Sequence, residues 1–368
     1  MSLTHETGAA VARTKVAVPA SAGPRSDGGR LHRPAWMRPA PRASGSPAGS
    51  GGRRRRWVTA LVAVSALPWG VWAFVRLTGI ESGFPAVALI AFTPYAAATS
   101  AVPVAAALLA RRGWIALAAA AAAAVLLCCV VARGLPGPAP AAGGPRLTVL
   151  SANVYFGLAD PDALVRLVRE HRVDVLSLQE LTPQADDALT RSGLRALLPY
   201  DVTDAGTGPV GGAVYSAYPV EEVGGSEPAA YFAMPRARVR VPGAAPIEVV
   251  STHAMPPSDG AAVPRWRGSL RDLPDARPNG RVRVLAGDFN ATLDHAEFRS
   301  LLDTGYVDAA AATGAGWSST WPAGGPLPGA VIDHILVDRR AGVHRTSVHT
   351  VPDTDHRAVL AELALPQE

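Results

Sequence analysis

The 368-residue sequence contains only two cysteines and one lysine. Cys128 and Cys129 are adjacent in an apolar stretch, so they cannot link distant parts of the chain. A fold that depends on disulfide bonds is therefore excluded, and the redox compartment stays open. Lys15 is the single lysine among 35 basic residues, and together with the abundance of alanine this indicates a GC-rich genome rather than a function.

The C-terminal part of the chain lacks an excess of positive charge. Residues 1–56 hold 11 basic and 2 acidic residues, residues 57–145 hold 4 and 1, and residues 146–368 hold 20 and 27. Proteins that bind a nucleic-acid backbone usually present a basic face on the binding domain itself. The acidic C-terminal region therefore disfavours nucleic acid as a partner, although a local basic stripe is not excluded.

Charged residues are nearly absent from three long stretches, 57–77, 84–109 and 114–131. Each is close to or above the about 20 residues that a membrane-spanning helix needs. We therefore predict three transmembrane helices within residues 57–133. The alternative is a buried bundle in a soluble protein, but these stretches have no polar face to expose to water. The second stretch contains Pro85, Pro94 and Pro103, which membrane helices tolerate where neighbours satisfy the freed carbonyls.

Arginines around these stretches predict their orientation. Arg53–Arg56 precede the first stretch, and Arg111 and Arg112 separate the second from the third, whereas the connection between the first two contains only Glu81. Because positive charge accumulates on the cytoplasmic side, the tail and the Arg111 loop should be cytoplasmic. Three crossings then place the C-terminal domain outside, in a multi-pass protein of the cell membrane.

The remaining segments complete the predicted organisation. Residues 1–56 form a basic tail whose Pro-, Gly-, Ser- and Arg-rich part, 1–52, is expected to be disordered. A cleaved signal peptide is not expected, since such segments are much shorter than this leader. Residues 134–145 read as a Pro/Gly/Ala linker. Residues 146–368 form the C-terminal domain, in which no solenoid repeat is visible.

Residues 146–368 show strands mixed with a few helices. Asp160 is predicted to cap a helix over 161–171, with Leu164, Leu167 and Val168 on one face. Apolar runs predict strands at 147–153, 173–178, 212–216, 237–241, 247–252, 282–286, 332–337 and 358–362.

The chain is organised around Gly287-Asp288-Phe289-Asn290, which follows the predicted strand at 282–286. In extended backbone Asp288 and Asn290 point the same way. A carboxylate that orients water beside an amide that holds a phosphoryl oxygen suits phosphate chemistry. A plain turn with Asx hydrogen bonds is the alternative for this motif alone. A functional site is favoured over a plain turn because other polar residues also stand at the ends of predicted strands. They are Asn153, Glu180, His253, Asp333, Asp355 and His356.

As a set, these motifs resemble the endonuclease/exonuclease/phosphatase superfamily, and they occur in that family's order. The matching stretches are Ser151-Ala152-Asn153-Val154, Leu178-Gln179-Glu180, Ser251-Thr252-His253, Gly287-Asp288-Phe289-Asn290, Ile332-Asp333-His334-Ile335 and Thr354-Asp355-His356-Arg357. The resemblance implies an α/β (α+β) fold, a four-layer sandwich of two mixed β-sheets flanked by helices. It also implies a metal-dependent phosphoric ester hydrolase.

The resemblance implies roles for individual residues. Glu180 would be the main ligand of Mg²⁺, or of Mn²⁺ in its place, because hard oxygen donors suit such ions. Asn153 would assist, and Asp355 would reach this metal or a second one. Asp288 would orient and deprotonate the attacking water, while Asn290 fixes that water and the phosphate.

Two histidines and an arginine complete the implied site. His356 would lie against the phosphate, with Asp333 fixing its tautomer and favouring the imidazolium. His253 would donate to a non-bridging oxygen as charge grows in the transition state. Arg236 matches the place of a cleft arginine that contacts the phosphate.

The sequence also departs from the nuclease pattern. Ala254-Met255-Pro256-Pro257 follows His253, and the loops after Tyr200 and His253 look short, without the inserted basic helix or loop with which nucleases grip a duplex. The complete layout resembles the actinomycete membrane proteins associated with teicoplanin resistance. We therefore expect a membrane-anchored phosphoesterase acting on a lipid-linked or small phosphorylated cell-envelope substrate. The alternatives are an extracellular endonuclease and a catalytically silent binding or resistance module.

Overall fold

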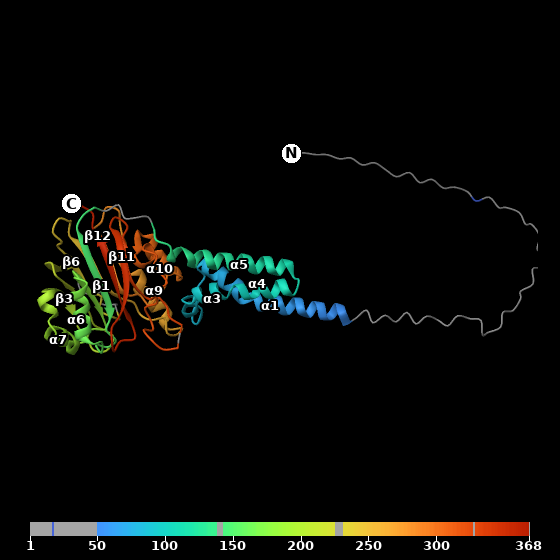
Figure 1. Ribbon diagram of the computed structural model, residues 1–368, viewed down its shortest axis with the longest axis horizontal. Coiled ribbons are helices and arrows are strands. Elements are labelled where there is room, and N and C mark those ends of the chain that lie inside the picture. Colours follow the sequence, from blue (N-terminus) through green and yellow to red (C-terminus); the bar gives the residue numbers. More distant parts are fainter. Residues whose placement is uncertain (1–16, 18–49, 138–142, 225–230, 327, 368) are drawn as a thin grey trace, which may run out of the picture. The chain divides into compact units, whose positions relative to one another are not determined.

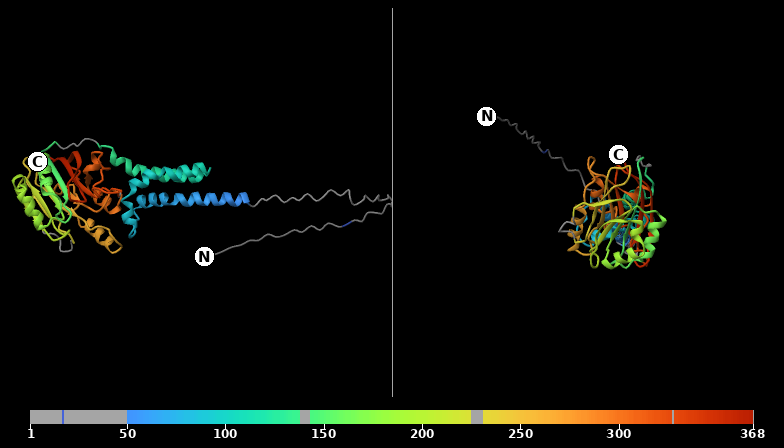
Figure 2. Two further views of the ribbon diagram at one scale, coloured as in Figure 1. Left: turned by 60° about the horizontal axis from the view of Figure 1, so that its bottom comes forward. Right: turned by 90° about the vertical axis from the view of Figure 1, so that its left-hand side faces the viewer.

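The computed structural model describes residue 17 and residues 50–137, 143–224, 231–326 and 328–367. Most of the expected disordered tail and part of the expected linker lie outside the described residues. The end of the tail is described and is helical, so the expected disorder is wrong for residues 50–52. The chain divides into two units, Met1–Ser50 and Gly51–Glu368, and the description below concerns the second. Figure 1 and Figure 2 show its helices and strands.

The N-terminal helices correct the prediction of three continuous spans. The first and third stretches form α1 (Ser50–Thr78) and α5 (Gly113–Val131), but the second is broken into α2 (Ala86–Ile90), α3 (Thr93–Thr99) and α4 (Ala101–Leu109). Pro94 stands in the first turn of α3, where it lacks an N–H group and its ring prevents a helix from continuing through it. Within the described residues, two helices are long and apolar enough to cross a membrane, Gly52–Thr78 and Gly113–Gly134.

The shorter apolar helix Thr93–Leu109 packs between these two. At 1.5 Å per residue it measures roughly 25 Å, somewhat less than the roughly 30 Å hydrocarbon core. Trp69 of α1 donates to the Ala96 carbonyl (3.1 Å), and Trp72 donates to Thr93 Oγ1 (3.0 Å). At the far end, Arg112 donates to the Arg55 carbonyl (3.0 Å), so the α4–α5 turn lies beside the start of α1.

The C-terminal region confirms the predicted two-sheet sandwich. One sheet has the order β11-β12-β1-β2-β4-β3 and the other β5-β6-β7-β8-β10-β9. Both are mixed, since β1 is parallel to β2 and β7 is parallel to β8, whereas the other pairs are antiparallel. The strands are β1 (Arg146–Asn153), β2 (Val175–Gln179), β3 (Tyr200–Asp204), β4 (Gly212–Ser216), β5 (Val220–Glu222), β6 (Arg236–Val239), β7 (Ile247–His253), β8 (Arg283–Asp288), β9 (Tyr306–Asp308), β10 (Asp333–Asp338), β11 (Gly342–Thr350) and β12 (Arg357–Ala364).

Helices cover both outer faces of the sheets (Figure 1). They are α6 (Pro161–Glu170), α7 (Pro183–Arg191) and α8 (Leu194–Leu197) on one face, α9 (Ala262–Arg271) and α10 (Ala296–Asp303) on the other, and α11 (Ala309–Ala312) beside β10 and β11. The Asp160 side chain caps α6 by accepting from the backbone of residues 162 and 163, as predicted. A central core of small aliphatic side chains such as Val149, Val249 and Val284 fills the space between the sheets.

The strand register determines where the polar strand ends meet. In the first sheet Asn153 pairs with Gln179, and in the second His253 pairs with Asp288, which also pairs with Asp333. A buried hydrogen bond from Ser177 Oγ to the Ala286 carbonyl (2.8 Å) joins the two sheets just beneath these ends. Because the parallel strands finish at one edge of the sandwich, residues from both sheets converge there.

Candidate active site

Three polar side chains from the two sheets are in direct contact at this edge. Asn153 Nδ2 donates to Glu180 Oε1 (3.1 Å) and to Asp288 Oδ2 (3.2 Å). His253 Nε2 lies 3.9 Å from Glu180 Oε1 and 3.8 Å from Asp288 Oδ2. All four residues are buried. The arrangement concentrates two carboxylates and an imidazole within reach of one reacting group.

Two of the site residues adopt strained backbone conformations. Glu180 has a φ of 60° and Asn290 a φ of 47°, in the left-handed region that residues with a Cβ seldom occupy. The Phe156 amide donates to Glu180 Oε2 (2.8 Å), and the Asn290 amide donates to Asp288 Oδ1 (2.8 Å). Strain of this kind costs about 1–3 kcal/mol per residue and persists where the surroundings fix the geometry. Here it aims both side chains into the cleft.

His356 is held as a cation between two carboxylates. Its Nδ1 donates to Asp333 Oδ2 (2.9 Å), and its Nε2 lies 3.8 Å from Asp288 Oδ2. Burial alone disfavours the charged ring, but Asp333 and Asp288 outweigh burial and raise the pKa of His356 to about 10. The ring therefore carries a positive charge at neutral pH.

His253 and Asp288 are shifted in ways that separate their roles. Burial, assisted by the neighbouring charge of His356, lowers the pKa of His253 to about 3, so this ring is neutral. The Phe232 ring stacks on it with centroids 4.2 Å apart. Burial and the charge of Asp333 raise the pKa of Asp288 to about 7, against the opposing effect of His356. A carboxylate with a pKa near neutrality is suited to accept a proton.

A cleft of about 570 Å³ opens over these groups. Five predicted site residues line it: Glu180, His253, Asp288, Asn290 and His356. Asn153 and Asp333 contact them from beneath through the hydrogen bonds given above. Asp355 lies at one side, where Oδ2 accepts from Trp321 Nε1 (3.0 Å) and Oδ1 is 3.9 Å from His356 Nε2.

Arg236 is the predicted site residue that the structure leaves outside this group. It begins β6, is half-buried, and is not among the described residues that line the cleft. The connection after His253 also differs from expectation, because it contains α9 with three arginines. Arg271 pairs with Glu297 (2.6 Å), and Arg267 donates to the Glu81 carbonyl, so these two side chains are engaged within the protein.

Several cleft residues escaped the sequence analysis. Phe156, Phe232 and Trp321 form apolar walls, and Ala88, Ala91 and Phe92 contribute a further wall from α2 and the start of α3. The aromatic residues stand in loops without periodicity, and the alanines belong to a stretch that reads as a membrane span. Thr354, which was noted only as part of a motif, donates to the Asn153 carbonyl (2.9 Å) and so joins the last strand to the first.

The donor set fits a hard divalent cation in part. Glu180 supplies carboxylate oxygen, and Asp355 Oδ1 is buried with no hydrogen-bond partner among the described residues. Oxygen donors of this type suit Mg²⁺. Asn153, however, presents its N–H group to the carboxylates while its Oδ1 accepts from the Tyr155 amide (2.9 Å). For Asn153 to bind a metal as expected, its side-chain amide must rotate so that Oδ1 faces the carboxylates.

A second group of potential ligands has a different explanation. One ligand atom each from Asp288, Asp333 and His356 lies within 4.8 Å of the others. Because His356 is protonated and donates to Asp333, its single positive charge offsets one of the two carboxylates. This group can therefore take part in proton transfer as well as in cation binding.

The loop that follows Asn290 is fastened to the N-terminal helices. Asp294 is fully buried, and Arg133 donates to both of its oxygens (2.7 and 2.9 Å), while Arg76 Nε donates to Oδ1 (2.9 Å). Thus residues at the C-terminal ends of α1 and α5 bind the loop that follows Asp288 and contains Asn290. We call this contact the Asp294 clamp.

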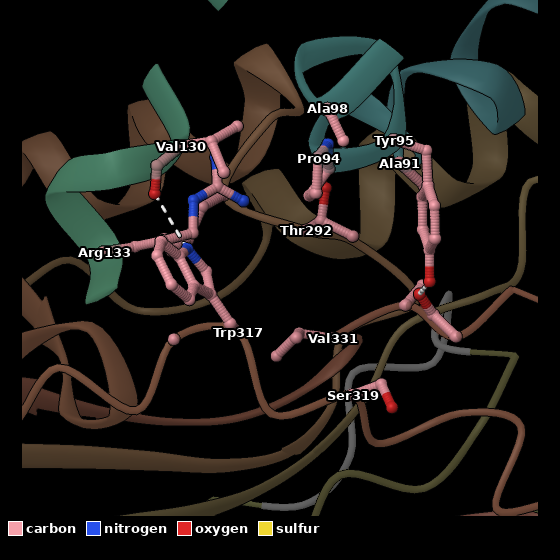
Figure 3. A pocket seen from close by; sticks show the side chains of 14 residues that line it. Ala91, Pro94, Tyr95, Ala98, Val130, Arg133, Thr292, Trp317, Ser319 and Val331 are labelled. Atoms are coloured by element: carbon pink, nitrogen blue, oxygen red, sulfur yellow. Dashed lines mark hydrogen bonds between the residues drawn. The ribbon is translucent and has the colours of Figure 1, made fainter. Parts of the chain in front are cut away.

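Beside the clamp lies a cavity of about 370 Å³ between α3, the end of α5 and the C-terminal region. Figure 3 shows Trp317 donating to the Val130 carbonyl (2.9 Å) beside Arg133, with Pro94, Ala98 and Tyr95 on the opposite wall. Ala91 and Ala330 line both this cavity and the cleft, so the two hollows adjoin.

The chain was compared with protein-family models and with solved structures. The model of the Endonuclease/Exonuclease/phosphatase family matches residues 150–356. Among solved structures, an AP endonuclease from Archaeoglobus fulgidus is 17% identical, with 58% of this chain and 98% of that chain covered and a TM-score of 0.47. The mannosyl-6-phosphatase Bt3783 of Bacteroides thetaiotaomicron VPI-5482 is 17% identical, with coverages of 59% and 99% and a TM-score of 0.45.

A third solved structure, an endonuclease/exonuclease/phosphatase from Beutenbergia cavernae DSM 12333, is 18% identical over 60% of this chain and 72% of that chain, with a TM-score of 0.45. None of these similarities indicates a substrate for this chain. No curated protein matches it.

Proposed function

Because the chain belongs to the endonuclease/exonuclease/phosphatase family of hydrolases, we propose that it is a membrane-anchored, Mg²⁺-dependent phosphoesterase acting outside the cytoplasmic membrane. Its substrate on this proposal is a lipid-linked or other cell-envelope phosphate ester, in keeping with the resemblance to teicoplanin-resistance proteins. One observation carries the proposal. A neutral His253, a cationic His356 and the proton-accepting Asp288 face one cleft whose wall is supplied by the apolar N-terminal helices.

The side chains divide the work of phosphate-ester hydrolysis. Asp288 accepts the proton of the attacking water, and Asn290, anchored to the Ala254 carbonyl (3.0 Å), orients that water against the phosphate. Neutral His253 donates a hydrogen bond to a non-bridging oxygen. Cationic His356 offsets the negative charge that grows in the transition state and gives its Nε2 proton to the leaving oxygen as the bond from that oxygen to phosphorus breaks.

A divalent cation would bind beside these catalytic groups. Glu180 and Asp355 would hold it, with Asn153 after rotation of its amide. When bound there, Mg²⁺ supplies positive charge that makes the phosphorus more open to attack. The protein residues perform the positioning and the proton transfer described above.

Membrane anchoring is supported by the surfaces of α1 and α5. Large apolar side chains of α1 are exposed along its whole length, among them Leu61 (69%), Val71 (58%) and Phe74 (57%). Such a surface is unfavourable in water and favourable in hydrocarbon. Arg53–Arg56 and the Arg111–Arg112 turn lie at the same end of the bundle, which supports a cytoplasmic location for that end and an external location for the cleft.

An anchored cleft favours substrates that share the membrane. A domain held at the bilayer meets lipid-borne phosphates at an effective concentration far above that of the same domain in solution. Soluble nucleic acids receive no such advantage.

The activity is tested with the full chain in lipid nanodiscs. We expect Mg²⁺-dependent phosphate release from a polyprenyl or alkyl phosphate ester, and little from single- or double-stranded DNA. Asp288→Asn serves as the inactive control. Faster hydrolysis of DNA than of any lipid-linked phosphate would contradict the proposal.

The location is tested separately by cysteine labelling. In a Cys128→Ala/Cys129→Ala background, Asp187→Cys on the exposed surface of α7 should react with a membrane-impermeant maleimide in intact cells. Arg53→Cys, near the start of α1, should react only after lysis. The opposite pattern would place the cleft in the cytoplasm and remove the cell-envelope substrate.

A further inference from the structure

The wall that α2 and the start of α3 add to the cleft has the chemistry of a hydrocarbon-binding surface. Ala88, Ala91 and Phe92 line the same hollow as Asp288 and His356. We propose that Ala88, Ala91 and Phe92 bind the hydrocarbon chain of the substrate next to its phosphate and thereby select esters with an apolar tail. This inference rests on the proposed function and names the residues that determine its specificity.

The wall is a fixed part of the C-terminal region. Val87 is fully buried in the outer core together with Trp266 and Phe289. His295 Nε2 donates to the Val87 carbonyl (2.9 Å), and the Ala296 amide donates to Glu81 Oε1 (2.7 Å). Because both contacts come from the segment that follows Asn290, the position of Ala88 relative to the catalytic groups is set by the fold.

The charged groups of the cleft are restricted to its floor. Among the described lining residues, only Glu180, Asp288 and His356 carry charge, and no arginine or lysine is present. The other walls are formed largely by the apolar side chains Phe156, Phe232, Pro256 and Pro257. A second phosphate would lose hydrogen bonds to water against these surfaces, whereas a hydrocarbon chain gains by leaving water.

The apolar wall continues toward the membrane helices. Ala91 and Ala330 are shared with the adjoining cavity of about 370 Å³, whose lining includes Pro94, Ala98, Val130 and Trp317 (Figure 3). Val130 belongs to α5, one of the two helices able to span a membrane. A ligand whose polar end is a phosphate and whose other end is a hydrocarbon chain therefore matches both ends of this surface.

The test compares two neighbouring residues of α2 that receive the same replacement. Ala88→Phe fills the wall, whereas Leu89→Phe changes a side chain that is 49% exposed and does not line the cleft. The full chain in nanodiscs of one lipid composition is assayed with alkyl phosphates of two to twelve carbons. Because substrate partitioning into the bilayer is the same for both variants, any difference between them reports on the wall.

We expect kcat/KM of the wild type and of Leu89→Phe to rise with chain length, by at most about fourfold per buried methylene. For Ala88→Phe the rise of kcat/KM should stop after the first carbons. The ratio of kcat/KM between Leu89→Phe and Ala88→Phe should therefore grow at least about tenfold from the shortest to the longest ester. A constant deficit at all chain lengths would overturn the inference and leave the proposed hydrolysis standing.

A second measurement separates the two proposals further. Binding of non-hydrolysable alkyl phosphonates of the same lengths is measured with the same proteins. If their affinity depends on chain length and on Ala88 while no phosphate ester is hydrolysed, the hydrocarbon surface stands and the proposed activity falls. If affinity is independent of both, the hydrocarbon surface is refuted.

Discussion

The Asp294 clamp makes a quantitative prediction about how the helices support the catalytic loop. Arg133→Met removes two charge-assisted hydrogen bonds to a carboxylate that is fully buried, and leaves the salt bridge from Arg76 in place. Removing one partner of a buried ion pair costs about 3–5 kcal/mol, because the other charge stays in a medium that solvates it poorly. Since Arg76 remains, we expect the lower end, about 3 kcal/mol.

Unfolding of the full chain in detergent micelles measures this cost, for example by urea titration followed by tryptophan fluorescence. For a domain of this size, about 3 kcal/mol corresponds to a fall in Tm of roughly 6–12 °C. Arg271→Met is the matched control, because its pair with Glu297 is exposed and should contribute only about 0–1 kcal/mol. Of these two variants, only Arg133→Met should also show a lower turnover number, since Asn290 lies in the clamped loop that follows Asp288.

A rescue variant tests the reasoning itself. In Arg76→Met/Arg133→Met/Asp294→Leu all three charges of the clamp are removed together, so the stability should return to near the wild-type value. Equal stability of Arg133→Met and Arg271→Met would refute the view that Asp294 is a desolvated charge held by the helices. Failure of the triple variant to recover would show that the arginines act through something other than that charge.

Three further outcomes are expected. Asp333→Asn, His356→Gln and the double variant should lose nearly equal activity, because the pair acts as one unit; losses that multiply would show independent roles. Burial lowers the pKa of His295 to about 4, and protonation of Nδ1 would break its bond with the Thr292 amide (2.8 Å). In that pH range the unfolded state binds a proton that the folded state does not, so the free energy of unfolding of the wild type should fall as the pH is lowered from 6.5 to about 4. In urea titrations the free energy of unfolding of His295→Gln should depend less on pH over the same range. Excess chelator should abolish turnover, and Glu180→Gln should raise the Mg²⁺ concentration for half-maximal rate by at least about tenfold, the scale seen when a metal site loses a supporting group; full activity in chelator would exclude a metal requirement.

Local sequence signals were sufficient for the strand ends that carry the chemistry. The run before Gly287 is apolar and fully buried, so the strand and the position of Asp288 at its end could both be predicted. The same holds for Asp160, whose capping role depends only on neighbouring backbone. In contrast, β11 was missed because most of its residues are only partly buried at the edge of a sheet, His344 and Arg345 are exposed, and the strand shows no clear apolar alternation.

Long-range contacts account for the remaining errors. Phe84–Leu109 reads as one apolar span, and only the docking of Val87 into the outer core reveals why the chain bends there. Arg236 has the expected sequence context, but its place at the start of β6 keeps it off the cleft lining. The aromatic walls belong to loops whose positions depend on the whole fold, so no local pattern identified them.

The burial of Val87 bears on how the protein is made. This residue is synthesised before every strand of the sandwich, yet its side chain completes a core built from Trp266, Phe289 and Leu336. During biosynthesis the first helices emerge well before those partners exist. The outer core can therefore close only after the later strands have returned to α2. Completion of this core is in this way coupled to the correct placement of a segment that is made long before it.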